Sequence, residues 1–188
     1  MQRSGFVLAG GASSRMGRDK ALLPYHGTTL LEHIARAVEE AAGEVALIGD
    51  PGRYGGFGYP VYPDEIPGRG PLGGLYTALR VSTADWNLVV ACDMPGITAD
   101  VLRGLLDRAA ASNRNSIAAT GPDGRPEPLC AVYHRSCLPA VTRAIGDNRL
   151  RMRDLVRELE AGSALVDPSS IANVNTPKEW ADFVQEPR

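Results

Sequence analysis

A glycine-rich segment near the N-terminus holds the densest set of chemically useful side chains. Residues 8–20 read LAGGASSRMGRDK and carry glycine, serine and three cations, Arg15, Arg18 and Lys20. Glycine lets backbone N–H groups approach a ligand closely, and Arg and Lys pair with anionic oxygens. The composition therefore suits a phosphate-binding loop. The alternative is an ordinary strand-to-helix turn with exposed bases.

A carboxylate follows an apolar run later in the chain. Residues 88–92 read LVVAC and lead directly to Asp93. Mg²⁺ prefers hard oxygen ligands, and nucleotide phosphates with water can complete the shell around one protein carboxylate. We therefore expect Asp93 to bind Mg²⁺. The alternative is that Asp93 caps the next helix, a role for which Thr98 is well suited. We expect Cys92 to be a packed strand residue rather than a nucleophile.

Two common nucleotide-binding motifs do not account for these residues. No GxxxxGK[ST] occurs, which weakens ATPase and GTPase interpretations. Residues 68–73 satisfy GxGxxG, but prolines separate them from the nearest strand and Pro71 lacks the N–H that a phosphate needs. A dehydrogenase is therefore disfavoured.

Short apolar runs alternate with segments of helical period, which is typical of a layered α/β domain. The predicted strands are residues 5–9, 45–48, 61–62, 87–91, 116–119, 129–133 and 164–166. The predicted helices are residues 28–42, 73–82, 99–111, 136–145, 151–159 and 177–184. Residues 51–60 and 63–74 are rich in glycine and proline and are predicted as loops. The glycine-rich segment and Asp93 each follow a strand, where ligands of open α/β sheets bind.

Composition bounds the remaining possibilities. The chain has 188 residues, a net charge of −2 and no long apolar run, which favours one domain over residues 1–188 and disfavours nucleic-acid or membrane binding. Three cysteines without a CxxC pair indicate neither a disulfide framework nor a zinc site. The apolar stretch at residues 6–9 is shorter than the core of a signal peptide, so we expect a cytoplasmic location rather than secretion.

Several motifs resemble those of one enzyme family. Residues 8–22 resemble LAGGxSxRMGxDKAL, the opening signature of the molybdenum cofactor guanylyltransferases within the nucleotidyltransferase superfamily. Cys92, Asp93 and Pro95 resemble the family's CDxP motif. Asp64 with residues 70–74 resembles its second loop, residues 127–129 resemble the segment that shapes the acceptor side, and residues 173–177 resemble its NxNTP segment.

The resemblance implies a single-domain, Rossmann-like α/β/α fold of three layers with a mostly parallel central sheet. It also implies Mg²⁺-dependent transfer of GMP from GTP to the phosphate of molybdopterin, with pyrophosphate leaving. The implied catalytic residues are Arg15, Lys20 and Asp93, with Asp93 as the metal ligand. The implied nucleotide-binding residues are Leu8, Ala9, Gly10, Gly11, Lys20, Asp64, Gly70, Gly73, Gly74 and Asp93.

The acceptor side is expected at Asn173 and Asn175, which the resemblance places beside the pterin or the metal. Arg149 is added as a candidate anion-binding residue, against the alternative of a solvated, ion-paired helix. Asp64 alone would be read equally well as a turn cap, and residues 175–177 alone as a helix start. GTP and molybdopterin are the expected partners, and transient contact with molybdoenzyme chaperones is compatible with this function.

Three alternatives stay open at this point. The cytidylyl branch resembles LAAG where this chain has LAGG, so base choice depends on Gly10. A sugar-phosphate nucleotidyltransferase usually has a longer chain. A GTP-binding module that delivers cofactor without catalysis would not need Arg15, Lys20 and Asp93 together.

Overall fold

The central element is a seven-stranded sheet. The computed structural model describes residues 2–10 and 19–185. The strands lie in the order β5-β4-β1-β6-β8-β7-β9, and β8 runs antiparallel to both neighbours while the other adjacent pairs are parallel. Their bounds are β1 Arg3–Leu8, β4 Val45–Ile48, β5 Val61–Tyr62, β6 Trp86–Ala91, β7 Ser116–Thr120, β8 Pro126–His134 and β9 Gly162–Leu165.

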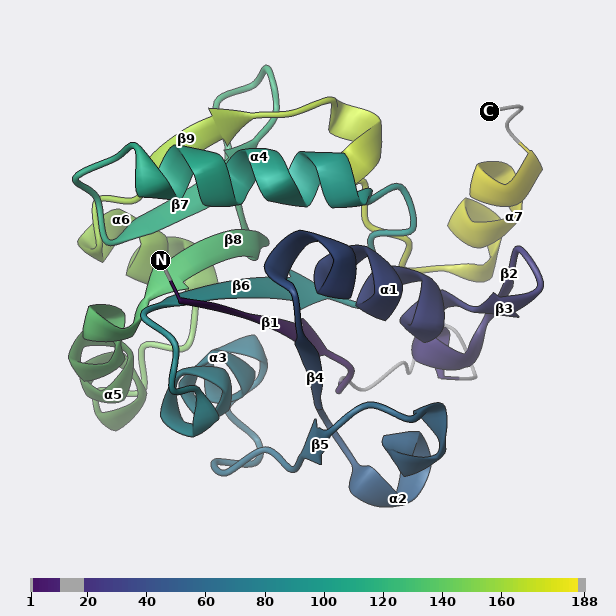
Figure 1. Ribbon diagram of the computed structural model, residues 1–188, viewed down its shortest axis with the longest axis horizontal. Coiled ribbons are helices and arrows are strands. Elements are labelled where there is room, and N and C mark those ends of the chain that lie inside the picture. Colours follow the sequence, from purple (N-terminus) through teal and green to yellow (C-terminus); the bar gives the residue numbers. More distant parts are fainter. Residues whose placement is uncertain (1, 11–18, 186–188) are drawn as a thin grey trace.

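Helices cover both faces of this sheet (Figure 1). α1 (Leu30–Ala42) and α4 (Ala99–Ala110) pack on one face, and α3 (Pro71–Val81), α5 (Leu138–Gly146) and α6 (Met152–Glu158) pack on the other. The short hairpin of β2 (Pro24–Tyr25) and β3 (Thr28–Thr29) lies beside α7 (Pro177–Gln185). The predicted class, three α/β/α layers around a mostly parallel sheet, is confirmed.

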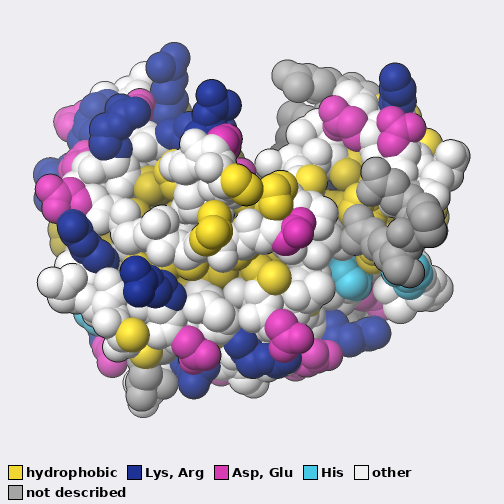
Figure 2. Space-filling view, turned by 90° about the horizontal axis from the view of Figure 1, so that it is seen from above, with side chains coloured by type: hydrophobic (Ala, Val, Ile, Leu, Met, Phe, Trp, Pro, Cys, Tyr) yellow, Lys and Arg dark blue, Asp and Glu magenta, His cyan; other side chains and the backbone are white. Residues whose placement is uncertain are grey.

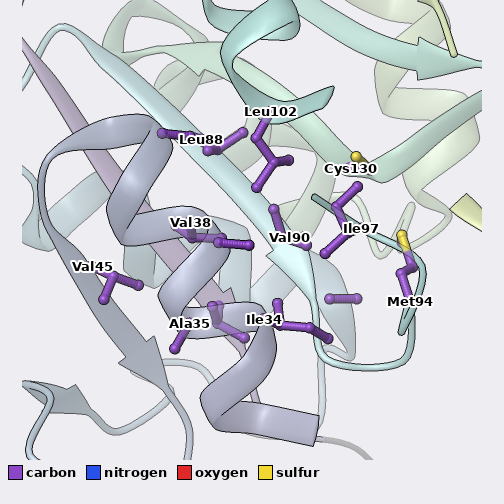
Figure 3. Close-up of a cluster of buried hydrophobic side chains, with 14 of the residues drawn as sticks. Ile34, Ala35, Val38, Val45, Leu88, Val90, Met94, Ile97, Leu102 and Cys130 are labelled. Atoms are coloured by element: carbon purple, nitrogen blue, oxygen red, sulfur yellow. The ribbon is translucent and has the colours of Figure 1, made fainter. Parts of the chain in front are cut away.

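The core on the α1 side follows from the apolar period of that helix. Ile34, Ala35 and Val38 are fully buried and belong to the same hydrophobic cluster as Leu88 and Val90 of β6, which Figure 3 shows in close-up. The helix begins at a capping box in which Thr29 accepts from the Glu32 amide and the Glu32 carboxylate accepts from the Thr29 amide. It ends at Gly43, whose φ of 91° suits glycine.

The chain reverses its direction of winding beside β1. It passes from β1 through α1 outward to β4 and β5, and then returns through α3 to β6 on the other side of β1. Because α1 and α3 lie on opposite faces, the carboxyl ends of β1 and β6 border a topological switch point. Ligands of open α/β sheets bind in the crevice at such a point.

Two predicted loops are shorter than expected. Residues 51–60 do not form a loop throughout, because α2 (Pro51–Tyr54) and a 3₁₀ turn (Gly55–Phe57) occupy part of them, and the predicted loop of residues 63–74 ends where α3 begins at Pro71. The Asp50 carboxylate accepts from the Gly52 amide at 2.8 Å, and Pro51 takes the first helical position. A local N-cap signal therefore outweighed the glycine content. The hairpin of β2 and β3 was not predicted either.

The surface carries charges of both signs (Figure 2). That view looks onto α4 and β9, and hydrophobic side chains are exposed near its middle. Leu165 of β9 is the most exposed large hydrophobic residue in the described part of the chain, at 77%. Within residues 2–10 and 19–185, no helix has both the length and the apolar character needed to cross a bilayer.

Candidate active site

A cavity of about 200 Å³ opens at the switch point. Its wall comes from the ends of β1 and β6, from the turn that starts at Asp19, from the start of α3 and from β8. The lining residues are Leu8, Ala9, Gly10, Asp19, Lys20, Pro71, Ala91, Cys92, Asp93 and Leu129. Five residues that the sequence assigned to a ligand, Leu8, Ala9, Gly10, Lys20 and Asp93, thus line one cavity. Arg15 and Gly11 lie outside the described residues.

Lys20 connects three segments that are distant in the sequence. Its Nζ donates a 2.6 Å hydrogen bond to Asn175 Oδ1 and lies 3.9 Å from Asp93 Oδ2. The Lys20 and Asp93 side chains are only 16% and 24% exposed, so the ion pair is screened less than a surface pair. The structure therefore brings the predicted cation, carboxylate and acceptor-side asparagine together.

Asp93 is poised to bind a cation. Burial raises its pKa above the ordinary value, Lys20 opposes that shift, and Glu127 adds to it. Its Oδ1 is buried and has no hydrogen-bond partner among the described residues. A buried carboxylate oxygen without a partner is costly, and a bound cation would satisfy it. The donor set fits a hard divalent ion. The described residues contain no cluster of three acidic, His or Cys side chains that could hold a metal without help from a ligand.

The segment after β9 is attached to this site. The Val174 amide donates to the Asp93 carbonyl at 2.8 Å, which holds Asn173 and Asn175 close to the cavity. Asn173 Nδ2 donates to Glu127 Oε2 at 3.4 Å. The Glu179 carboxylate accepts from the amides of Asn175 and Thr176, so the helix-start geometry of α7 is present as well.

Pro71 of the second predicted loop lines the cavity, whereas Asp64, Gly70, Gly73 and Gly74 pack beside it. Asp64 Oδ1 accepts from the Ile66 amide at 3.0 Å, which is the turn-capping role. A Cβ on Gly73 would lie 2.9 Å from the Ile66 carbonyl and 3.0 Å from Asp64 Oδ2. Gly74 likewise leaves room for Leu8. Gly70, with a φ of 60°, caps α3. These glycines let α3 approach the loop and β1.

Arg149 is paired with carboxylates away from the cavity lining. Its guanidinium donates to Glu158 at 2.7 Å and to Asp147 at 3.3 Å, and the bond to Glu158 raises the Arg149 pKa. The ion-paired arrangement considered as the alternative is therefore present. Cys92 behaves as expected, because burial raises its pKa to about 12 and keeps the thiol protonated at neutral pH.

Sequence reasoning placed Asp19 and Glu127 inside motifs but assigned no individual role to either residue. Asp19 immediately precedes Lys20 inside the glycine-rich segment, so its position was available as a signal. Glu127 comes near Asp93 because β8 runs antiparallel to β6, with Val90 opposite Cys130. Pairing of that kind cannot be read from either strand alone.

A doubly wound α/β fold with a lysine beside a largely buried carboxylate at its switch point is typical of proteins that bind phosphorylated ligands at the edge of a sheet. The chain belongs to the MobA-like NTP transferase domain family, whose model matches residues 5–163. The predicted superfamily is thereby confirmed.

Relatives extend the match over nearly the whole chain. A Clostridium perfringens protein named as a probable molybdenum cofactor guanylyltransferase is 38% identical, covering 99% of this chain and 98% of its own. Among solved structures, molybdopterin-guanine dinucleotide biosynthesis protein A from Archaeoglobus fulgidus has a TM-score of 0.79, 21% identity and 96% coverage of both chains. A Mycobacterium tuberculosis protein crystallised with manganese has a TM-score of 0.74, 21% identity and full coverage of both. The two structures support the fold.

Proposed function

We propose that this protein transfers GMP from GTP to the terminal phosphate of molybdopterin and releases pyrophosphate. The observation that carries the proposal is the placement of Lys20 between Asp93 and Asn175 at the switch point. This arrangement suits a site where a polyphosphate and a second anion must be brought together to react. The relatives support this choice of substrates, because they are named as probable molybdenum cofactor guanylyltransferases and this chain matches them over almost their full length.

The reaction needs little chemistry from the side chains. The phosphate of the acceptor is already an anionic nucleophile, so no general base is required. Catalysis then reduces to in-line alignment of two anions and neutralisation of the charge that develops on the α-phosphate and the leaving pyrophosphate. Lys20 supplies positive charge beside the cavity. The backbone at Gly10 and Gly11 would approach the nucleotide phosphates, and Arg15 would add a second cation.

A divalent cation, Mg²⁺ in our proposal, would be held by Asp93 through the oxygen that lacks a partner. When bound, it would supply charge neutralisation between the phosphates. Asn173 and Asn175 would face the acceptor, and Asp64 with Gly70, Gly73 and Gly74 would shape the nucleotide side. Arg149 is a further proposed contact of the acceptor. To bind the acceptor, its guanidinium would have to leave Glu158 and Asp147.

The compartment proposed for this reaction is the cytoplasm. Cys92, Cys130 and Cys137 are all free thiols in the structure, which suits a reducing environment.

Pyrophosphate release tests the choice of nucleotide. The full chain is incubated with Mg²⁺ and molybdopterin, and release is compared for GTP, CTP and ATP. The proposal expects release with GTP at least about tenfold faster than with CTP or ATP, and none without acceptor. Preference for CTP would replace the base assignment with a cytidylyltransferase. Binding of GTP without any release would indicate a non-catalytic module.

A further inference from the structure

A small cluster of polar side chains holds the residue immediately before Lys20. Asp19 Oδ2 accepts hydrogen bonds from the Tyr54 hydroxyl at 2.7 Å and from Arg53 Nη1 at 3.1 Å. Its other oxygen, Oδ1, accepts from the Ala21 amide at 3.1 Å. Both carboxylate oxygens of Asp19 are therefore engaged, one by its own turn and one by α2.

The Tyr54 end of this cluster is fixed. Tyr54 is only 2% exposed, and its ring lies so close to Gly49 that a Cβ there would be 2.9 Å away. Gly49 directly follows β4, and the Ala9 amide donates to the Ile48 carbonyl of that strand at 2.9 Å. Burial and the Asp19 carboxylate together raise the pKa of Tyr54, so the hydroxyl keeps its proton and remains a donor. The sheet thus supports the donor rigidly.

The Asp19 end of this cluster adjoins Lys20 in the chain. Asp19 is the N-cap of the 3₁₀ turn Lys20–Leu22, so its carboxylate sets where the Lys20 backbone begins. At the far end of the same side chain, Nζ is bound to Asn175. Lys20 is thus bordered at its backbone by the cap that Asp19 forms and contacted at its ammonium by Asn175. Asp19 also lines the cavity, whereas Tyr54 does not.

We propose that Tyr54 is a positioning residue that acts through Asp19 to hold the Lys20 ammonium in the alignment the transfer needs. Arg53 contributes a second, solvent-exposed bond to the same oxygen. This inference rests on the proposed function and adds to it a role for α2, which contributes no residue to the cavity wall. Misplacement of a catalytic group by a fraction of an ångström to one ångström reduces turnover more than it reduces substrate binding.

Tyr54→Phe tests the role by removing one hydroxyl. We expect kcat to fall about tenfold while KM for GTP changes by less than about twofold. The decisive comparison is a double-mutant cycle with Lys20→Gln, using α-labelled GTP to follow the slow variants. If Tyr54 acts through Lys20, adding Tyr54→Phe to the Lys20→Gln variant causes no further decrease in kcat. Equal losses in both backgrounds, or an unchanged kcat for Tyr54→Phe, would overturn the inference.

Ser4→Ala is the matched control. Ser4 is a buried hydroxyl that also donates to a carboxylate, Glu44, but it lies at the start of β1, at the opposite edge of the sheet. We expect Ser4→Ala to lower the unfolding temperature as Tyr54→Phe does, without the loss of kcat. Calorimetric binding of GTP with Mg²⁺ to the unmodified protein separates the two claims. Absence of binding and turnover there contradicts the proposed function itself, whereas normal wild-type turnover with an unaffected Tyr54→Phe contradicts only the role of Tyr54.

Discussion

Two opposing effects act on the pKa of Asp93 and prepare its carboxylate to bind a cation. Burial alone favours a protonated Asp93, and Lys20 at 3.9 Å pulls the carboxyl toward its ionised form. Desolvation is the larger of the two effects, so the pKa stays raised. The protein without ligand therefore holds a carboxylate that is less stable than it would be in water. Binding of a cation would relieve that cost, which makes the residue a ready ligand.

Replacement of Asp93 by Asn separates function from stability. We expect Asp93→Asn to reduce turnover by at least about 100-fold, because it removes the charge that holds the metal. The unfolding temperature of the metal-free variant should equal or exceed that of wild type, because a neutral side chain of the same shape has a smaller desolvation cost, and desolvation of the Asp93 carboxylate outweighs its attraction to Lys20. Thermal unfolding and product formation are measured on the same samples. A variant with near-normal turnover in saturating Mg²⁺ would contradict the metal assignment.

Asn175→Ala addresses the other partner of Lys20. Hydrogen bonds to a charged group contribute about 1.5–3 kcal/mol, but at this partly exposed position water can replace the lost amide oxygen and offset most of that contribution. We expect kcat to fall about tenfold or more with little change in the unfolding temperature, since Asn175 is partly exposed. Steady-state kinetics with GTP varied at saturating acceptor provide the measurement. A pure increase in KM for GTP would instead mean that Asn175 binds substrate without aligning Lys20.

At the scale of elements, local signals identified most segments but not their partners. Strand residues 45–48 and 61–62 coincide with the structure, and α4 begins after Thr98, whose hydroxyl accepts from the Val101 amide. These elements have clear caps or apolar runs. β8 is longer than predicted, because Pro126–Pro128 and His134 extend it through pairing with β7 and β6. Such extension depends on neighbours distant in the chain, so composition could not predict it.

Gly96, in the loop after β6, lies where this loop packs closely against the segment after β9. A Cβ there would overlap the carbonyl oxygen of Ser169, in the 3₁₀ turn Pro168–Ile171. We expect Gly96→Ala to destabilise the protein by about 1–3 kcal/mol and to lower turnover, because it displaces the segment that carries Asn173 and Asn175. Gly104→Ala is the control, since Gly104 is an exposed position inside α4 with open space around it.

The control should behave in the opposite way. Alanine in the interior of a helix is favoured over glycine by about 0.5–1 kcal/mol, so Gly104→Ala should stabilise the fold and leave turnover unchanged. Urea unfolding gives the change in stability of each variant, and product formation gives its turnover. Equal effects from the two substitutions would mean that the contact of Gly96 with Ser169 does not hold the segment in place.

His33 makes the packing of α1 against the loop after β6 sensitive to pH. Burial lowers its pKa below 6.5, and the backbone at Pro95 and Ile97 partly opposes the shift. A depressed pKa means that the unfolded chain binds the proton more readily. The stabilising contribution is therefore complete above about pH 6.5 and is lost as the pH falls through the folded-state pKa. Between pH 5 and 8, the free energy of unfolding should depend less on pH for His33→Phe than for wild type. The same pH dependence in both proteins would contradict the assignment.

At the scale of the whole molecule, the topology decides which residues meet. β1 and β6 are neighbours although α1, β4, β5 and α3 separate them in the chain, so Ala9, Gly10 and Asp93 lie at one edge of the sheet. The general rule for α/β sheets predicted that edge from the sequence. The contacts of Glu127 and Asp19 were not predicted, because they depend on an antiparallel strand and on packing against α2. Asp64 and Arg149 were named, but their observed partners are a turn amide and two carboxylates.

Transfer of label from GTP tests the central claim most directly. GTP labelled at the α-phosphate is incubated with molybdopterin, Mg²⁺ and either wild type or Asp93→Asn, and the label is followed into the acceptor. Our account predicts one labelled GMP on each acceptor phosphate with wild type and a loss of at least about 100-fold with Asp93→Asn. Label that remains in GTP, or appears as free GMP at equal rates with and without molybdopterin, would contradict it.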